Sequence, residues 1–175
     1  FKGGKMSIES FSLSGKRAIV SGYLHPWGEP SAQALAEAGA QVILATLPPR
    51  ETRALAKEMG GLALPTPTRA EAIRRTVEQA AQGGKIDILV NCFDVAFAQP
   101  LLEMEIAEWR KVLEANLTPL FLWCREVGRH MVGQKGGKIV NMASLLGERA
   151  VANCTAYCTS MGGVIQFTKA LSLEW

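Results

Sequence analysis

Short apolar runs alternate along this chain with longer segments of helical periodicity, and glycines stand at many of the boundaries. This alternation is typical of βαβ units, in which crossover helices join parallel strands. The run at residues 86–91 is mostly apolar, as expected for a strand that is buried on both faces. The pattern therefore predicts an α/β fold built on a parallel sheet.

The boundaries of the expected elements follow from Gly and Pro residues between the runs. Gly39 and Gly83–Gly84 stand where helices end, and Pro48–Pro49 stands where one begins. We expect a Rossmann-type, doubly wound sheet in one domain over residues 12–175, preceded by a tag or N-terminal extension at residues 1–11. The expected strands are 17–21, 41–45, 62–65, 86–91 and 138–142, and the expected helices are 31–38, about 50–60, 70–81, 107–131 with a break near Pro119, and 157–175.

Charge and cysteine content argue against several classes of function. Nineteen Lys and Arg against 16 Asp and Glu give a net charge of +3, without a basic stripe for nucleic acid or a membrane surface. No apolar run has transmembrane length. The four cysteines include no CxxC pair, which favours a reduced, cytoplasmic protein. Cys154 and Cys158 stand one helical turn apart, but the histidines are far away in sequence, so we expect no metal site.

The segment between the first expected strand and the first expected helix is a candidate cofactor loop. Ligands of open parallel sheets bind beyond the carboxyl ends of the strands. Glycines at such an end let backbone N–H groups approach a pyrophosphate at the helix N-terminus. The candidate cofactor-binding residues of this loop are Ser21, Gly22, Trp27 and Gly28.

A serine and a tyrosine form the stronger candidate for chemistry. Ser144 lies just past the strand expected at 138–142, and Tyr157 lies thirteen residues later, at the start of an expected helix. A phenol can donate a proton to a carbonyl oxygen or accept one from an alcohol, and a hydroxyl can orient that oxygen. The spacing and the flanking elements together indicate a catalytic pair.

These segments carry a resemblance to a known family. Residues 138–144, Lys-Ile-Val-Asn-Met-Ala-Ser, and 157–163, Tyr-Cys-Thr-Ser-Met-Gly-Gly, resemble the paired active-site segments of short-chain dehydrogenases/reductases. Residues 114–117 and 35–40 resemble two further segments of that family, so the resemblance spans nearly the whole chain.

The resemblance implies an oxidoreductase that uses NAD or NADP on a carbonyl or a secondary alcohol. Tyr157 would be the catalytic acid/base, Ser144 would hold the substrate oxygen, and Asn116 would hold a water of the proton relay. The residues implied to line the cofactor phosphates and the nicotinamide are Gly22, Gly28 and Asn91.

Several residues depart from the family pattern. Met161 stands where the family has a Lys that lowers the pKa of the Tyr and hydrogen-bonds the nicotinamide ribose, and a thioether supplies neither charge nor donor. Such a loss should raise the barrier by roughly 2–4 kcal/mol. The final strands and closing helix of the family fold are absent from this chain. Further departures on the cofactor side are Pro26, Thr46–Leu47, Pro67 and Cys92–Asp94.

Three functions therefore stay open. The first is an oxidoreductase with a degenerate cofactor site and impaired hydride transfer. The second is a non-redox enzyme that uses Ser144 and Tyr157, in the manner of a dehalogenase, lyase or isomerase. The third is a non-catalytic subunit, because the helices at 107–131 and 157–175 correspond to the family's subunit-packing helices and imply a homo-oligomer (a dimer or tetramer) or pairing with a homologue. Residues that would be either partner contacts or ordinary core are Leu120, Trp123, Val164 and Phe167.

Overall fold

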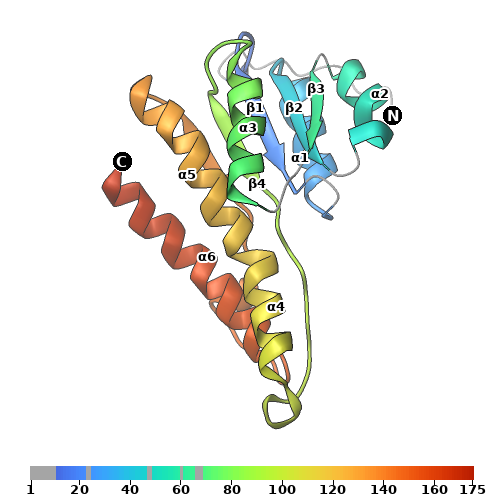
Figure 1. Cartoon of the computed structure of the whole chain (residues 1–175), viewed down its shortest axis with the longest axis vertical. Coiled ribbons are helices and arrows are strands. Elements are labelled where there is room, and N and C mark those ends of the chain that lie inside the picture. The colour runs from blue at the N-terminus through green and yellow to red at the C-terminus, as the bar shows by residue number, and fades with distance from the viewer. Residues whose placement is uncertain (1–10, 23–24, 47–48, 60, 66–68) are drawn as a thin grey trace.

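The predicted parallel sheet is confirmed. The protein was analysed as a computed structural model, which describes residues 11–22, 25–46, 49–59, 61–65 and 69–175. Its five strands run parallel in the order β3-β2-β1-β4-β5, a Rossmann-like arrangement in which the strand order reverses between β1 and β4 (Figure 1). The strands are β1 (Arg17–Ser21), β2 (Gln41–Thr46), β3 (Leu62–Pro65), β4 (Ile88–Asn91) and β5 (Lys138–Asn141).

The helices fall close to their expected places, with two corrections. The first helix begins at Gly28 rather than at residue 31, and the last begins at Thr155 rather than at residue 157. The break expected near Pro119 lies at Leu117, where two helices meet. The helices are α1 (Gly28–Glu37), α2 (Pro49–Glu58), α3 (Ala70–Ala81), α4 (Ile106–Asn116), α5 (Thr118–Gly133) and α6 (Thr155–Glu174), with short 3-10 helices η2 (Leu101–Glu103) and η3 (Leu145–Gly147).

Local chemistry explains two of these boundaries. Gly39 follows the C-cap of α1 with a φ of +97°, a left-handed conformation that glycine adopts without steric cost. Pro119 lies in the first turn of α5, where its missing N–H removes no helical hydrogen bond. The chain therefore ends α4 at Asn116 and restarts beside the proline.

The core lies on both faces of the sheet, because alternate strand residues point to opposite sides. On one face, Ile19 and Leu89 pack with residues of α3, α5 and α6. On the other face, Val20 and Val42 pack with residues of α1 and α2. Leu120, Trp123 and Val164 are buried in the first of these clusters and Phe167 packs against it, so the core interpretation of these four residues is correct.

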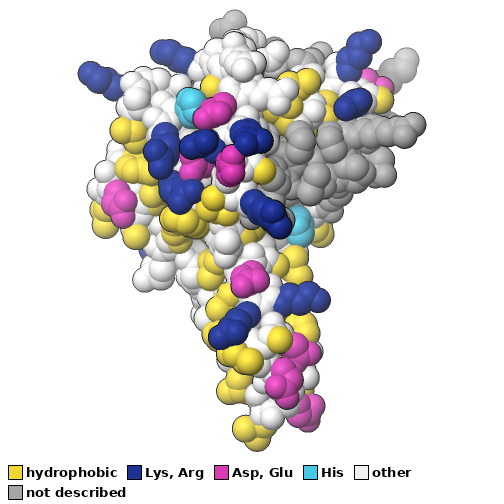
Figure 2. Space-filling model, viewed as in Figure 1, with side chains coloured by type: hydrophobic (Ala, Val, Ile, Leu, Met, Phe, Trp, Pro, Cys, Tyr) yellow, Lys and Arg dark blue, Asp and Glu magenta, His cyan; other side chains and the backbone are white. Residues whose placement is uncertain are grey.

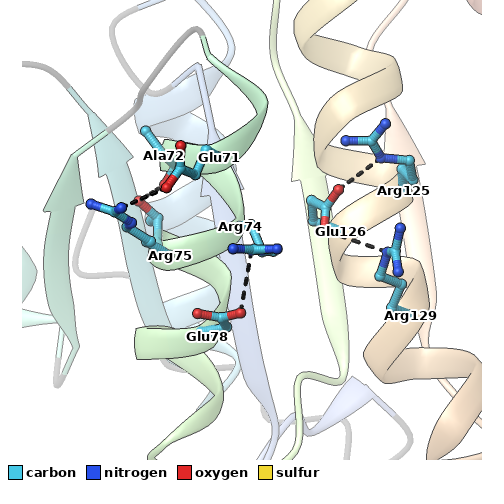
Figure 3. Close-up of polar contacts among 9 residues, drawn as sticks. Glu71, Ala72, Arg74, Arg75, Glu78, Arg125, Glu126 and Arg129 are labelled. Atoms are coloured by element: carbon cyan, nitrogen blue, oxygen red, sulfur yellow. Dashed lines mark hydrogen bonds and ion pairs between the residues drawn. The ribbon is translucent and has the colours of Figure 1, made fainter.

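Charged side chains of both signs intermingle on the outer face of α3 and α5 (Figure 2). Glu71 pairs with Arg75 and Arg74 with Glu78 on α3, whereas Arg125 and Arg129 both contact the buried Glu126 on α5 (Figure 3). The exposed pairs on α3 contribute little, typically below about 1 kcal/mol each.

The helices and the placement of possible ligand side chains bear on the membrane and metal expectations. Within the described residues, no helix is both long enough and apolar enough to cross a membrane. Over the same residues, no group of three or more His, Cys, Asp and Glu side chains is placed to hold a metal ion.

Candidate active site

The candidate site lies at the carboxyl ends of the central strands. Beyond β4 the chain runs away from the sheet to the turn that holds η2, and it returns through α4 and α5 (Figure 1). The start of α6 lies in the same region, because Tyr157 in its first turn contacts Asp94, which follows β4, and Ser144, which follows β5. This is the edge at which open α/β sheets bind their ligands.

A row of buried and half-buried polar side chains ties the strand ends together. Ser21, Asn91 and Asn141 occupy paired positions on β1, β4 and β5. The Ser21 hydroxyl donates to Asn91 Oδ1 at 2.5 Å, and Asn91 Nδ2 donates to Asn141 Oδ1 at 2.8 Å and to Cys124 Sγ at 3.3 Å. Asn141 in turn donates to Thr168 on α6 at 2.9 Å. The side chain of Asn91 is thus bonded within the protein, and its expected contact with a nicotinamide stays a prediction.

Tyr157 lies in the first turn of α6 and points at a carboxylate. Its hydroxyl donates to Asp94 Oδ1 at 2.6 Å, and the residue is 6% exposed. Burial raises the pKa of Tyr157 most, and the hydrogen bond to Asp94 raises this pKa further, whereas a hydrogen bond with Ser144 lowers it. The structure therefore brings Ser144 and Tyr157 together and leaves the phenol protonated at neutral pH.

Asn116 is fully bonded inside the protein. Its Oδ1 accepts from the N–H of Val95 at 2.8 Å, and its Nδ2 donates to the Val95 carbonyl at 3.1 Å and to Ser160 Oγ at 2.9 Å. Ser160 donates to the backbone carbonyl of Tyr157 at 2.8 Å. Asn116 thus connects the segment after β4 to the helix that carries Tyr157, and its side-chain donors are already used. Its expected part in holding a water stays a prediction.

The loop after β1 can approach a phosphate closely, although it offers few backbone donors. Gly22 has a φ of +70°, and Gly28 is buried at the start of α1, whose N-cap residue, Trp27, makes no side-chain capping bond. The N–H groups of Gly28 and Ser31 bond to the carbonyls of His25 and Trp27. Pro30 has no N–H. Of residues 28–31, Glu29 is therefore the one whose N–H can bind a phosphate oxygen.

The glycines and the helix N-terminus therefore fit the phosphate end of a dinucleotide. The ribose end fits less well, because Met161 is fully buried and uncharged. The indole of Trp27 is half exposed beside the loop. The departures at Thr46–Leu47 and at Pro67 involve side chains outside the described residues.

Two residues of this arrangement were not predicted as site residues. Asp94 is named in the sequence analysis only within the Cys92–Asp94 departure from the family pattern, and Ser160 is not singled out. The bond from Tyr157 to Asp94 joins positions 63 residues apart, which no local pattern encodes. The signal for Asp94 in the sequence was an acidic residue shortly after a strand end.

Comparisons with known proteins agree with this geometry. The family model for short chain dehydrogenases matches residues 16–175. A D-threitol dehydrogenase of Mycolicibacterium smegmatis is 37% identical over 179 residues, covering 98% of this chain and 69% of the relative. A 2-dehydro-3-deoxy-D-gluconate 5-dehydrogenase of Pseudoalteromonas atlantica is 36% identical over 176 residues, covering 96% of this chain and 69% of the relative.

A solved structure extends the likeness to three dimensions. The gluconate 5-dehydrogenase of Burkholderia cenocepacia, crystallised in complex with NADP and tartrate, superposes with a TM-score of 0.89 at 28% identity. The match covers 94% of this chain and 68% of that one. The chain therefore belongs to the short-chain dehydrogenase/reductase family, a family of oxidoreductases. The coverage agrees with the expectation that the last strands and helix of the family fold lie outside these 175 residues.

Proposed function

We propose that this protein is a nicotinamide-dependent oxidoreductase that interconverts a carbonyl and a secondary alcohol. One observation carries the proposal: Tyr157 and Ser144 contact each other beyond the strand ends, at the same edge of the sheet as the glycine loop. A proton donor placed there serves a carbonyl oxygen, and a hydroxyl beside it orients that oxygen.

The protein's own residues have separate parts in the proposed reaction. Gly22 and Gly28 would hold the cofactor phosphates, and NAD or NADP, when bound, supplies or accepts the hydride. Tyr157 would donate its phenolic proton to the substrate oxygen, and Ser144 would hold that oxygen by a hydrogen bond. Asn116 would keep Tyr157 in place through Ser160.

Met161 should make hydride transfer slow. A buried thioether one turn after Tyr157 on α6 supplies no positive charge to stabilise a phenolate. We expect a Met161→Lys variant to gain about 10²–10³-fold in kcat/KM, the order of a single electrostatic contribution to catalysis. A matched Met161→Leu variant keeps the apolar contact and should gain nothing.

The names of the relatives indicate a first substrate class. D-threitol dehydrogenase and the two gluconate-type 5-dehydrogenases are named for polyhydroxylated substrates. We propose polyols, sugar acids and their ketones as the first compounds to screen with this chain. Asp94 offers a carboxylate oxygen at the site to which a hydroxyl of such a substrate can donate.

The bond between Tyr157 and Asp94 favours one alternative, a cofactor-free reaction that uses the phenol as an acid. Calorimetric titration of NADH and NADPH into the parent protein separates the two functions. Micromolar binding that Gly22→Ala weakens supports the oxidoreductase. No binding by the parent or by Met161→Lys contradicts it and leaves the acid-catalysed alternative, or a non-catalytic subunit, as the function to test.

A further inference from the structure

A carboxylate without a cationic partner occupies the centre of the site. Asp94 is half buried, and its Oδ1 accepts the hydrogen of the Tyr157 hydroxyl at 2.6 Å. In the described part of the chain, no Lys or Arg forms an ion pair with it. No Lys or Arg of the described residues therefore offsets the effect of this carboxylate on Tyr157.

Asp94 is held at this position from both sides. The carbonyl oxygen of Asp94 lies 3.3 Å from Nδ1 of His25 in the loop after β1. The next residue, Val95, is bonded through both its N–H and its carbonyl to Asn116. The chain of bonds then runs from Asn116 through Ser160 to the carbonyl of Tyr157. The Asp94–Tyr157 contact thus closes a ring of hydrogen bonds.

We propose that Asp94 is a positioning residue that accepts the phenol hydrogen of Tyr157 and holds this side chain as a neutral proton donor, so that the site favours carbonyl reduction over alcohol oxidation. The assignment of direction rests on the proposed function. The assignment of Asp94 as the group that holds the phenol rests on the ring of bonds alone.

The direction follows from where the proton stands at the start of each reaction. In reduction, a hydride adds to the carbonyl carbon, the π electron pair moves to oxygen, and that oxygen takes the proton of Tyr157; the phenolate then regains a proton from solvent. Oxidation of an alcohol requires the phenolate first. An anionic carboxylate at hydrogen-bond distance disfavours a second anion beside it.

The other groups that face Tyr157 do not reverse this effect. Ser144, which follows β5, donates to the phenolate form and works in the opposite direction, but it carries no charge. Cys158, the next residue on α6, adds to the effect of Asp94. Met161, one turn further on α6, is uncharged, and His25 meets Asp94 only at its backbone carbonyl.

Ultraviolet titration of the tyrosines tests the assignment without cofactor or substrate. The chain has two tyrosines, Tyr23 and Tyr157, so subtracting the titration of a Tyr157→Phe variant isolates Tyr157. We expect tyrosinate absorbance of Tyr157 to appear at lower pH in Asp94→Asn than in the parent. Glu114→Gln, which removes an exposed carboxylate on α4, should leave the midpoint unchanged. An Asp94→Asn midpoint equal to that of the parent overturns the proposal.

A second measurement can overturn the assignment even if the Asp94→Asn variant does not fold. With tyrosine labelled at Cζ by carbon-13, the Tyr157 resonance of the parent should titrate at higher pH in the folded protein than in urea. Titration at the same or lower pH overturns the assignment.

The turnover numbers in the two directions test the directional part separately. Asp94→Asn should raise kcat for alcohol oxidation relative to kcat for carbonyl reduction, and an unchanged ratio contradicts the directional part. A lower Tyr157 midpoint in Asp94→Asn without dinucleotide binding supports the assignment of Asp94 and rejects the proposed function. Dinucleotide binding together with an unchanged Tyr157 midpoint supports the proposed function and rejects the assignment of Asp94.

Discussion

At the scale of single residues, Gly22 shows how tightly the loop after β1 is packed. Its φ of +70° lies in the left-handed region, and a Cβ there would stand 3.1 Å from the backbone carbonyl carbon of Cys92 and from the ring of Phe93. Cys92 and Phe93, which follow β4, therefore leave little room for a side chain at this position.

We expect Gly22→Ala to lower the free energy of unfolding by about 1–2 kcal/mol, since a left-handed conformation costs that much for a side chain with a Cβ. Urea unfolding followed by circular dichroism measures this loss. Gly133→Ala, at the end of α5, is the matched control, because a Cβ there meets nothing within 4 Å. A Gly22→Ala protein as stable as the control would contradict the packing described.

Three buried acidic groups predict how stability depends on pH. Burial raises the pKa of Cys92 from 9.0 to about 11 and that of Cys124 from 9.0 to about 12, and it also raises the pKa of Tyr157. The folded protein thus keeps these protons at pH values where the unfolded chain releases them. This contribution to stability is complete below pH 9.0 and is lost as the pH rises towards 12.

Thermal unfolding between pH 7 and 10.5 should therefore show a flat Tm up to about pH 9 and a fall above it. The Cys124→Ala variant should be less stable at pH 7 and should lose less Tm between pH 9 and 10.5. Cys154→Ala, which removes a half-buried thiol, should keep the slope of the parent. A Tm that rises above pH 9 would contradict the sign of all three shifts.

At the scale of elements, Asn116 links α4 to α6 across the segment after β4. It is fully buried, and it makes three hydrogen bonds through one amide group. Removing it leaves two backbone groups of Val95 and the Ser160 hydroxyl short of a partner.

We expect Asn116→Ala to lower the free energy of unfolding by about 2–3 kcal/mol, because buried partners lose their hydrogen bonds. Thr118→Ala, an exposed position on the first turn of α5, should change it by less than about 0.5 kcal/mol. The Asn116→Ala variant should also show a changed Tyr157 titration, since the first turn of α6 loses its tie to the segment after β4. Equal stability of the two variants would mean that water replaces the lost bonds.

The sequence predicted elements best where the chain marks their ends. The strand at 62–65 and the helix at 70–81 were predicted to the residue. The start of α1 was missed because its N-cap, Trp27, is not one of the residue types that mark a helix start, and its side chain makes no capping bond. The break at Leu117 lies close to the expected position, because Pro119 signals it.

The site was predictable only in part. Tyr157 and Ser144 carry their own local signal, namely a strand end followed by a helix start. Their partner Asp94 does not, because the contact depends on how the segment after β4 is held against α6 by Asn116. Spacing along the chain cannot predict a contact that tertiary packing creates.

At the scale of the whole molecule, β5 is less well covered than the other strands. It pairs with β4 on one side, and Val140 is 48% exposed on the face that α1 and α2 cover elsewhere. An uncovered strand edge with apolar side chains favours pairing with another chain.

We expect this 175-residue chain to self-associate with increasing concentration, and Val140→Lys to reduce that association, because Lys opposes edge-to-edge pairing. Light scattering or sedimentation velocity across a concentration series measures the effect. Val132→Lys, an equally charged change at an exposed valine of α5, is the matched control. Equal effects of the two variants would point to net charge instead of the strand edge.

The strand order also affects how the chain acquires its structure. The central strand β1 pairs on one side with β4, and the bonded residues Ser21 and Asn91 are 70 residues apart in sequence. A growing polypeptide therefore leaves the ribosome with the middle strand of its sheet open on that side until β4 emerges. Contacts of such long sequence separation slow folding. Translation speed between β1 and β4 should thus influence how much of this protein reaches its native state in the cell.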